Sequence, residues 1–319
     1  MNLFTRTHTG LAVFILAAAL LGTGTAGASA DAPRSSTPVF VLEKGRFTVF
    51  DVPDRGIGEG VSVDNRGRIV GGTRPDDPAS CAFRGYLRDA HGRFSVIAVP
   101  GAAMTNPLKI NDHGQVVGNY RDHDPCTDPL NGFLRDERGR YASIRFPGST
   151  DTQAAGINDR GQVVGQYAVP DGSTHGYVWT HGRYRTLDVA GAATTSLLDI
   201  NDRGEIVGAY ADPDGTSHGF VRDTRGRITT IDAAGAVYTL PFGINNRGQV
   251  VGLSTDALPL PDAHETHGFL LRHGAGGPFT RIDVPGAAAT GAFDINDSGT
   301  IVGQYGNPEN AARTPEEIR

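Results

Sequence analysis

The chain is poor in several residue types that mark particular protein classes. Its 319 residues include two cysteines, two methionines and one tryptophan, and Lys44 and Lys109 are the only lysines. No long stretch is rich in Ala, Leu, Glu and Lys, so a helical bundle or coiled coil is not expected. Basic residues number 29 against 35 acidic ones, so no basic excess supports nucleic-acid binding.

Turn-forming residues are abundant instead. The chain contains 44 glycines and 19 prolines, and hydrophobic residues make up 38% of it, which is enough for a packed core. Glycine at close to twice its average frequency favours many tight turns between short strands. The composition therefore predicts one large all-β domain.

The first thirty residues have the features of a secretory signal peptide. Arg6 precedes an apolar run, LAVFILAAALLG (11–22), and small residues ending in Ala28-Ser29-Ala30 follow it. The run is too short to span a bilayer as a helix, which needs about 20 residues. No cysteine lies near the cleavage site and no twin-arginine pair precedes the run. We therefore expect export by the general secretory route to the periplasm or the extracellular space, without a membrane anchor.

A segment of about eleven residues recurs along the rest of the chain, and INDRGQVVGQY (157–167) represents it. Related copies lie at 63–73, 110–120, 200–210, 244–254 and 295–305, and their turn glycines are 43 to 51 residues apart. Asn and Asp tolerate turn geometry, and glycine supplies a positive φ. Each copy therefore predicts a β-hairpin with a tight Asn-Asp-x-Gly turn.

A second segment alternates with the first, and GFLRDERGRYASIRFPGS (132–149) represents it. Further copies lie at 85–102, 176–192, 219–236 and 268–287, and each reads as another hairpin. Two hairpins in a period of 40 to 50 residues make one four-stranded blade of a β-propeller.

The two ends of the repeat region complement each other. The last period has its first hairpin at 295–305 but no second one, and residues 40–53 match the missing hairpin. We therefore predict a six-bladed propeller over residues 39–305 whose sixth blade is shared between the two ends. Sharing leaves no open sheet edge, and no feature requires an oligomer, so a monomer is expected. Residues 31–38 would form a linker and 306–319 a polar tail.

The hairpin motif, followed by His-Gly-Phe and Gly-Arg-x-x-x-x-Asp, resembles the HAF repeat of exported bacterial proteins. The resemblance covers about residues 39–305, which is almost the whole mature chain. It implies an extracellular, β-propeller-like protein, and it implies no reaction, because the family has no assigned catalytic residues to carry over.

Three repeated polar positions are interpreted as structural. Catalytic groups must converge on one point, whereas a residue repeated in each blade would lie at the rim and build a turn. This interpretation applies to Asp112, Asp159, Asp202 and Asp297, to Asp51, Asp188, Asp232 and Asp283, and to His175, His218 and His267 as backbone-bonding residues at strand starts.

The loops between the second and third strands of each blade differ most between repeats. In a propeller these loops share one face with the connections between blades, and here they are acidic. The carboxylates predicted to gather there are Asp122, Asp124, Asp171, Asp212, Asp214, Asp256 and Asp262, with Asp76, Asp77 and Asp128 beside them. Clustered carboxylates repel one another unless a cation neutralises them. Ca²⁺ is the cation that such oxygen ligands would suit, although ordinary solvated loops explain the composition as well.

The residue before each first-hairpin isoleucine should lie near the propeller axis. By this reasoning Lys109 could face Asp199 and Asp294, either as a self-satisfying polar group or as a site with a shifted pKa.

Cys81 and Cys126 lie in the variable loops of adjacent blades, and in an exported protein they predict a disulfide.

Two classes of function remain from the sequence, beside a structural module whose only task is stable presence outside the cell. The first is a binding scaffold that uses the acidic, loop-rich face to hold a glycan, an envelope polymer or another exported protein. The second is a cation-dependent hydrolase or lactonase-type enzyme with a site at the channel mouth. A propeller fold hosts both. The deviations from the repeat are spread over several loops, which favours binding over catalysis.

Overall fold

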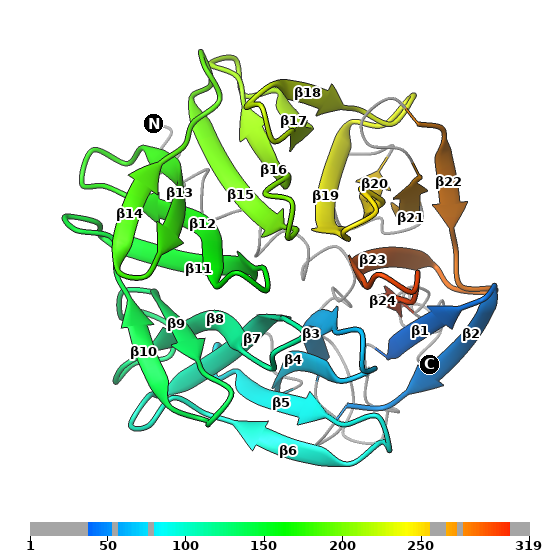
Figure 1. Cartoon of the computed structure of the whole chain (residues 1–319), viewed down its shortest axis with the longest axis horizontal. Coiled ribbons are helices and arrows are strands. Elements are labelled where there is room, and N and C mark those ends of the chain that lie inside the picture. The colour runs from blue at the N-terminus through cyan, green and yellow to red at the C-terminus, as the bar shows by residue number, and fades with distance from the viewer. Residues whose placement is uncertain (1–37, 53–56, 76–79, 256–265, 273–276, 307–319) are drawn as a thin grey trace, which may run out of the picture.

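The computed structural model describes residues 38–52, 57–75, 80–255, 266–272 and 277–306. All regular structure in these residues is β, and the 24 strands are arranged around a central axis (Figure 1). The chain is thus an all-β propeller with four-stranded blades, as the repeat pattern predicts. Among the described residues, none forms a helix of the length and apolar character that crossing a bilayer requires.

Four blades are separate four-stranded sheets. The first contains β3 (Ile57–Val63), β4 (Ile69–Arg74), β5 (Arg84–Arg88) and β6 (Phe94–Ile97). The second contains β7 (Met104–Ile110), β8 (Val116–Arg121), β9 (Asn131–Arg135) and β10 (Tyr141–Ile144). A third contains β19 (Tyr238–Ile244), β20 (Val250–Thr255), β21 (Thr266–Leu271) and β22 (Phe279–Ile282).

The fourth separate sheet closes the ring. It joins β1 (Val39–Glu43) and β2 (Arg46–Phe50) to β23 (Ala289–Ile295) and β24 (Ile301–Gly306), in the order β2-β1-β24-β23. Val39 pairs with Gln304 across the join. The two ends of the repeat region therefore share one blade, as the unpaired hairpins predict.

The remaining strands form one eight-stranded sheet, which differs from the six separate blades predicted. It contains β11 (Asp151–Ile157), β12 (Gln162–Ala168), β13 (Thr174–Thr180), β14 (Arg183–Thr186), β15 (Thr194–Ile200), β16 (Ile206–Ala211), β17 (Ser217–Arg222) and β18 (Ile228–Ile231). Its halves are joined by a single parallel pair between Thr174 and Thr194. There the start of β13, the third strand of one four-stranded unit, approaches the start of β15, the first strand of the next, closely enough to share a backbone pairing.

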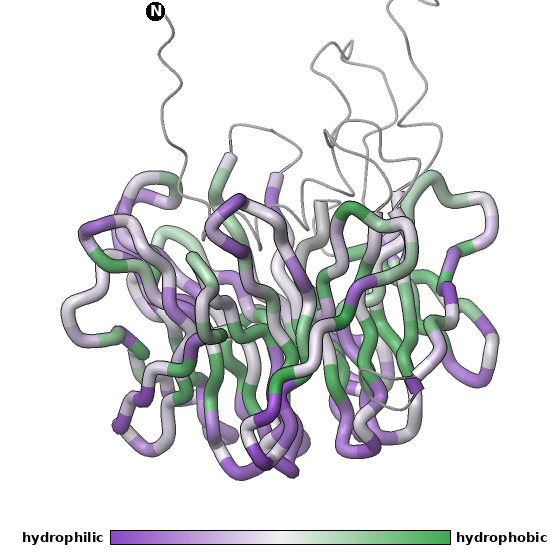
Figure 2. The backbone as a smooth tube through the Cα atoms, turned by 90° about the horizontal axis from the view of Figure 1, so that it is seen from above, coloured by the Kyte–Doolittle hydropathy of each residue, from purple (hydrophilic) through white to green (hydrophobic). Residues whose placement is uncertain are grey.

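Side-chain hydrogen bonds and glycine geometry build the hairpin turns. In the turn after β11, Asn158 Oδ1 accepts hydrogen bonds from the backbone N–H groups of Arg160 and Gln162, at 3.1 and 3.0 Å. Gly161 follows with a φ of +70°, a conformation that glycine adopts without steric cost. The tight turns lie together on one face and are hydrophilic, while the strands between the faces carry the apolar residues (Figure 2). We call this the turn face and the opposite one the loop-bearing face.

Apolar side chains between adjacent blades form the core. One cluster joins the closing blade to its neighbour through Val39, Val302, Val61 and Tyr86. Similar clusters recur around the ring, so each blade is stabilised by two neighbours and not by its own two faces alone.

Each inner strand contains a β-bulge. In β7 the register shifts between Pro107 and Lys109, and in β15 between Leu197 and Asp199. A bulge inserts one residue and redirects the side chains beside it. In these strands it therefore sets the direction of the residue nearest the axis.

Some predicted features lie outside the described residues. They are the signal peptide (1–30), the linker apart from Pro38, the tail from 307 to 319, and the loop residues Asp76, Asp77, Asp256 and Asp262.

Candidate functional site

An axial pocket opens on the turn face where the inner hairpins meet. Its volume is about 70 Å³. Three successive residues of each inner hairpin line it. The first is aliphatic, and the second and third are Asn or Asp. The second-position residues are Asp64, Asn111, Asn158, Asn201, Asn245 and Asn296, and the third-position residues are Asn65, Asp112, Asp159, Asp202, Asn246 and Asp297.

Lys109 lies at the inner end of this pocket between two carboxylates. Its Nζ donates hydrogen bonds to Asp199 Oδ2 and Asp294 Oδ1, each at 2.5 Å. Only 12% of the Lys109 side chain is exposed, and the two aspartates are buried. The structure therefore brings together the three channel residues singled out from the sequence, and any role in binding or chemistry stays a prediction.

The other carboxylate contacts tie the inner strands together. Ser62 Oγ and the Val63 N–H donate to Asp294 Oδ2 at 2.6 and 2.9 Å, and the Ile244 N–H donates to Asp199 Oδ2 at 2.9 Å. The remaining two inner strands have glycine at this level. A Cβ on Gly156 would lie 2.7 Å from the Asp199 Cα, and one on Gly243 would lie 2.9 Å from the Asp294 Cα. One residue from each of the six inner strands thus closes the axis. We call this set the polar plug, and it consists of Ser62, Lys109, Gly156, Asp199, Gly243 and Asp294.

The charges of Lys109, Asp199 and Asp294 affect one another's pKa. Burial raises the pKa of Asp199 to about 6, although the charge of Lys109 lowers it in part and Asp294 adds to the rise. Burial lowers the pKa of Lys109, but Asp199 and Asp294 together outweigh this effect, so the net pKa is raised. Lys109 therefore stays charged at neutral pH and is not a candidate general base or amine nucleophile.

The second-position residues form a belt of hydrogen bonds from blade to blade. Asn111 Nδ2 donates to the Asn158 carbonyl at 3.0 Å, and Asn158 Nδ2 donates to the Asn201 carbonyl at 3.1 Å. Asn201, Asn245 and Asn296 continue the series to the Asp64 carbonyl, each at 3.0 Å. Each asparagine thus builds its own turn with Oδ1 and links to the next blade with Nδ2.

The third-position residues close a ring around the axis. The backbone N–H of each donates to the side-chain Oδ1 of the next at 2.7 to 2.9 Å, in the order Asn65, Asp112, Asp159, Asp202, Asn246, Asp297 and back to Asn65. The prediction that these aspartates lie at the rim and build turns is therefore wrong. They line the axis, because the first strand of each blade is innermost, and the preceding asparagine builds the turn.

The two asparagines of the ring reduce its charge repulsion. Asn246 Nδ2 donates to Asp202 Oδ2 and Asp297 Oδ2 at 2.7 and 2.9 Å. Asn65 Nδ2 likewise donates to Asp112 Oδ2 at 2.5 Å. Asp159, between two other aspartates, has a raised pKa, first from partial burial and then from the charges of Asp202 and Asp112.

Three of the predicted carboxylates on the loop-bearing face, Asp124, Asp171 and Asp214, bond within their own loops. Asp124 Oδ1 accepts the N–H groups of Cys126 and Thr127 at 2.8 and 3.0 Å, and Asp171 Oδ1 accepts that of Ser173 at 2.8 Å. Asp214 Oδ1 accepts the Thr216 N–H at 2.9 Å. Short loops present more N–H groups than their strands can pair, so each carboxylate is used within its own loop.

These backbone contacts explain the electrostatics of the loops. They lower the pKa of Asp124, Asp171 and Asp214, because a hydrogen bond from an N–H group favours the charged carboxylate; in Asp171 the Ser173 hydroxyl contributes first. Two further carboxylates bind other side chains: Asp122 Oδ2 accepts from Arg145 Nη2 at 2.8 Å, and Asp212 Oδ2 lies 3.4 Å from His218 Nε2. In the part of the chain that the structure describes, no group of three or more His, Cys, Asp and Glu side chains could hold a metal ion. A Ca²⁺ site stays a prediction.

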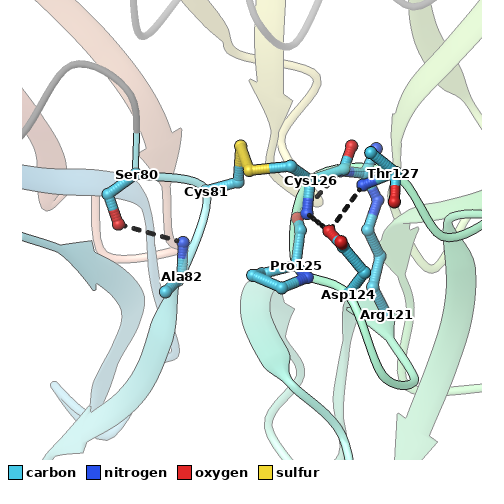
Figure 3. Close-up of a disulfide and its surroundings, with 8 residues drawn as sticks. All are labelled: Ser80, Cys81, Ala82, Arg121, Asp124, Pro125, Cys126 and Thr127. Carbon is cyan, nitrogen blue, oxygen red and sulfur yellow. Dashed lines mark hydrogen bonds between the residues drawn. A yellow bond between two sulfur atoms is a disulfide. The ribbon is translucent and has the colours of Figure 1, made fainter.

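The predicted disulfide between Cys81 and Cys126 is present, with the two Cα atoms 5.2 Å apart. It joins the loop before β5 to the loop before β9, on adjacent blades (Figure 3). Arg121 Nη1 donates to the carbonyls of Pro125 and Cys126 at 2.9 and 2.8 Å, so the cross-linked loop is also held from inside. A disulfide is consistent with an exported chain.

The repeated histidines bond to side chains and not to backbone as predicted. His175 Nδ1 lies 2.9 Å from Asp188 Oδ2, and the same atom of His267 lies 2.9 Å from Asp283 Oδ1. His218 Nδ1 lies 3.2 Å from Asp232 Oδ2. Each pair joins the start of a third strand to the end of a fourth, which explains why both residue types recur in the motif.

One of these pairs extends to a serine. Ser173 Oγ lies 3.0 Å from His175 Nε2, and Asp188 Oδ1 also accepts the Gly176 N–H at 3.0 Å. This Ser-His-Asp chain has the connectivity of a hydrolase triad. However, Ser173 Oγ also donates to Asp171 Oδ1 at 2.7 Å, which competes for the hydroxyl proton. The Ser173-His175-Asp188 series could not be found from the sequence, because Ser173 does not stand in a nucleophile motif.

Comparisons with known proteins support the fold and leave the family open. No family model matches the chain, and no curated relative does. Among solved structures, TolB from Agrobacterium tumefaciens aligns with a TM-score of 0.59 at 13% identity, over 84% of this chain and 98% of that one. TolB from Acinetobacter baumannii aligns with a TM-score of 0.54 at 12% identity, over 84% of this chain, which spans only 63% of the other's length. At such identities the likeness shows the propeller fold alone.

Proposed function

We propose that this chain is an exported binding scaffold that presents its loop-bearing face to another exported protein. Within this proposal the eight-stranded sheet counts as two blades, because one residue pair joins its halves, and the propeller is six-bladed. The HAF-repeat resemblance and export by the general secretory route belong to the same proposal.

The observation that carries the proposal is the pre-organisation of the loop-bearing face. The Cys81–Cys126 disulfide links two of its loops, and aspartates hold the backbone of the β8–β9, β12–β13 and β16–β17 loops. Loops fixed before binding lose less conformational entropy in a complex.

The axis supports binding over catalysis. The charges of Lys109, Asp199 and Asp294 are paired with one another at 2.5 Å, and the carboxylates around the pocket accept hydrogen bonds from the neighbouring hairpins. A general base or nucleophile must be able to reach a substrate atom. We therefore assign these residues to holding the ring of blades together.

The composition of the loops favours a protein partner over a glycan. The described loops at 122–130, 169–173 and 212–216 contain no aromatic residue. Aromatic rings supply the flat apolar surface on which a sugar ring rests. The described loops present carboxylates and hydroxyls instead, which suit a protein surface that carries basic groups.

Site-specific photo-crosslinking in the exporting cell tests the proposal. A photoreactive residue would replace exposed Thr127 or Thr216 on the loop-bearing face, with exposed Arg160 and Arg203 on the turn face as matched controls. We expect a discrete cross-linked protein from the first pair and none from the second. Equal products from both faces, or none from either, would overturn the proposal.

The Ser173-His175-Asp188 chain favours one alternative, a hydrolase whose site is on the loop-bearing face and not at the channel mouth. Ser173 Oγ would attack an ester carbonyl, His175 would carry the proton to the leaving alcohol, and water would then release the acid from the acyl-serine. A fluorophosphonate probe decides this alternative. Covalent labelling of the folded protein that Ser173→Ala and His175→Ala both abolish would establish it, and an unlabelled protein would exclude it.

A further inference from the structure

Two arginines face each other where the outer strands of the β11–β14 and β15–β18 units meet. Val178 in β13 and Phe220 in β17 belong to one apolar cluster between these units. Arg185 in β14 pairs directly with Val178, so the two side chains lie on the same side of the sheet. Arg222 is two residues after Phe220 in β17 and therefore lies on its side. We call the place where the two arginines face each other the β14–β17 seam.

The electrostatics of Arg222 agree with this placement. Burial lowers the pKa of its guanidinium, the charge of Arg185 lowers it further, and Asp223 opposes both effects in part. Arg222 is half-buried and Arg185 is exposed. The two like charges are therefore close enough to repel each other.

The nearby carboxylate is used elsewhere. Asp223 Oδ1 accepts the backbone N–H groups of Arg225 and Arg227, each at 2.9 Å, and its Oδ2 accepts from Arg227 Nε at 3.2 Å. Residues 176–187, which include β14, contain no Asp or Glu. Among the residues that the structure describes, neither Arg185 nor Arg222 forms an ion pair.

Arg185 also departs from the repeat. The strand registers place five neutral residues at the equivalent position of the other outer strands, namely Thr48, Ser95, Ala142, Thr229 and Thr280. Arg222 has counterparts in Arg88 and Arg135, so an arginine at that position belongs to the blade pattern. The Arg88 guanidinium lies 4.5 Å from the centre of the Phe50 ring, which is a favourable contact. Building a blade therefore accounts for Arg222 but not for an arginine opposite it.

Arg183 adds a third positive charge to the seam. It is exposed and lies two residues before Arg185 in β14, so it is on the same side of the strand. Its counterparts in three other blades pair with an aspartate of their own hairpin, as Arg93 does with Asp89 at 2.7 Å. The β13–β14 hairpin has no such aspartate. The seam thus gathers positive charge that its own residues do not balance.

We propose that the β14–β17 seam binds a phosphate group between Arg185 and Arg222, with Arg183 beside it. Facing guanidinium groups suit an anion of close to two charges, which a phosphate monoester carries at neutral pH. The planar fork of each guanidinium also matches two phosphate oxygens. A single carboxylate would leave one of the two facing charges unbalanced. The site lies near the tight turns of the β13–β14 and β17–β18 hairpins, so the inference goes beyond the proposed function and does not depend on it.

An NMR titration with inorganic phosphate at pH 8 tests the site. The signals followed are the Nε–H groups of Arg185 and Arg222, assigned by their loss in Arg185→Ser and Arg222→Gln. Acetate at equal ionic strength is the comparison anion. We expect both signals to shift with phosphate and to saturate, and to change little with acetate.

The two variants give the magnitude. Each should weaken phosphate binding at least about tenfold, because each removes a charge-assisted hydrogen bond. Arg138→Ser is the matched control, since it removes an exposed arginine from an outer hairpin of another blade and should leave binding unchanged. Ser95 stands at the place of Arg185 in β6, so Arg185→Ser should fold. Its melting temperature without phosphate should not fall, because it removes a like-charge contact.

Glycerol 3-phosphate and a short polyphosphate distinguish the source of the phosphate group. Tighter binding of the first indicates a small phosphate ester, and tighter binding of the second indicates a phosphate-bearing polymer.

Four results would overturn the inference. They are no shift of the two signals with phosphate, an equal shift with acetate, undiminished phosphate binding by folded Arg185→Ser, and a lower melting temperature of that variant in phosphate-free buffer. None of these affects the cross-linking at Thr127 and Thr216, so failure of the phosphate site and failure of the scaffold are distinguishable.

Discussion

Replacing Lys109 by methionine should destabilise the propeller more than any other single loss of charge near the axis. Methionine keeps much of the side-chain volume but removes the ammonium that bonds Asp199 and Asp294 at 2.5 Å. The aspartates are 0% and 2% exposed and would be left as adjacent, unpaired carboxylates. Breaking a buried charge pair from one side costs about 3–5 kcal/mol, which corresponds to a fall in melting temperature on the order of 10 °C.

Chemical denaturation at pH 8 and pH 5 measures this loss. It should be smaller at pH 5, where protonation relieves the repulsion between the carboxylates. Lys44→Met is the matched control, because Lys44 is 89% exposed and should change stability by less than about 0.5 kcal/mol. Adding Asp199→Asn and Asp294→Asn to Lys109→Met should recover most of the loss. If Lys109→Met is within about 1 kcal/mol of wild type at pH 8, the assignment of the plug to stability is wrong.

Three further predictions concern stability. Because the folded-state pKa of Asp199 is raised from 3.8 to about 6, the folded state binds this proton more tightly. Between pH 7 and pH 5 the wild type should therefore gain about 1 kcal/mol relative to Asp199→Asn, and parallel curves for the two proteins would contradict this. Gly156→Ala should cost about 1–3 kcal/mol, since its Cβ would lie 2.7 Å from the Asp199 Cα; unchanged urea unfolding would show that the axis has free space. Replacing Cys81 and Cys126 by serine opens a link across 45 residues and should cost about 4 kcal/mol in the chain-entropy model, and a melting temperature equal to wild type would refute this.

The repeat could be predicted from sequence because its signals are local. Each Asn-Asp-x-Gly turn is determined by a few neighbouring residues, as the bonds from Asn158 to Arg160 and Gln162 show. The shared closing blade followed from counting hairpins at the two ends. The eight-stranded sheet joined through Thr174 and Thr194 could not be predicted, because it depends on a spacing between β13 and β15 that no motif encodes.

The site could be predicted only in part, and the reason is distance along the chain. Lys109 and Asp294 are 185 residues apart, and their contact depends on ring closure and on bulges in the inner strands. The positions of the ring aspartates could not be predicted, because the repeat does not show that the asparagine of each Asn-Asp turn builds the turn while the aspartate lines the axis.

The direct test of the scaffold is a hydrogen-exchange footprint with the partner that cross-linking identifies. Our account predicts slower exchange in the β8–β9, β12–β13 and β16–β17 loops, and no change in the turns at 158–161, 201–204 and 245–248. Protection of those turns instead would place the partner over the axial pocket and contradict the assignment of binding to the loop-bearing face.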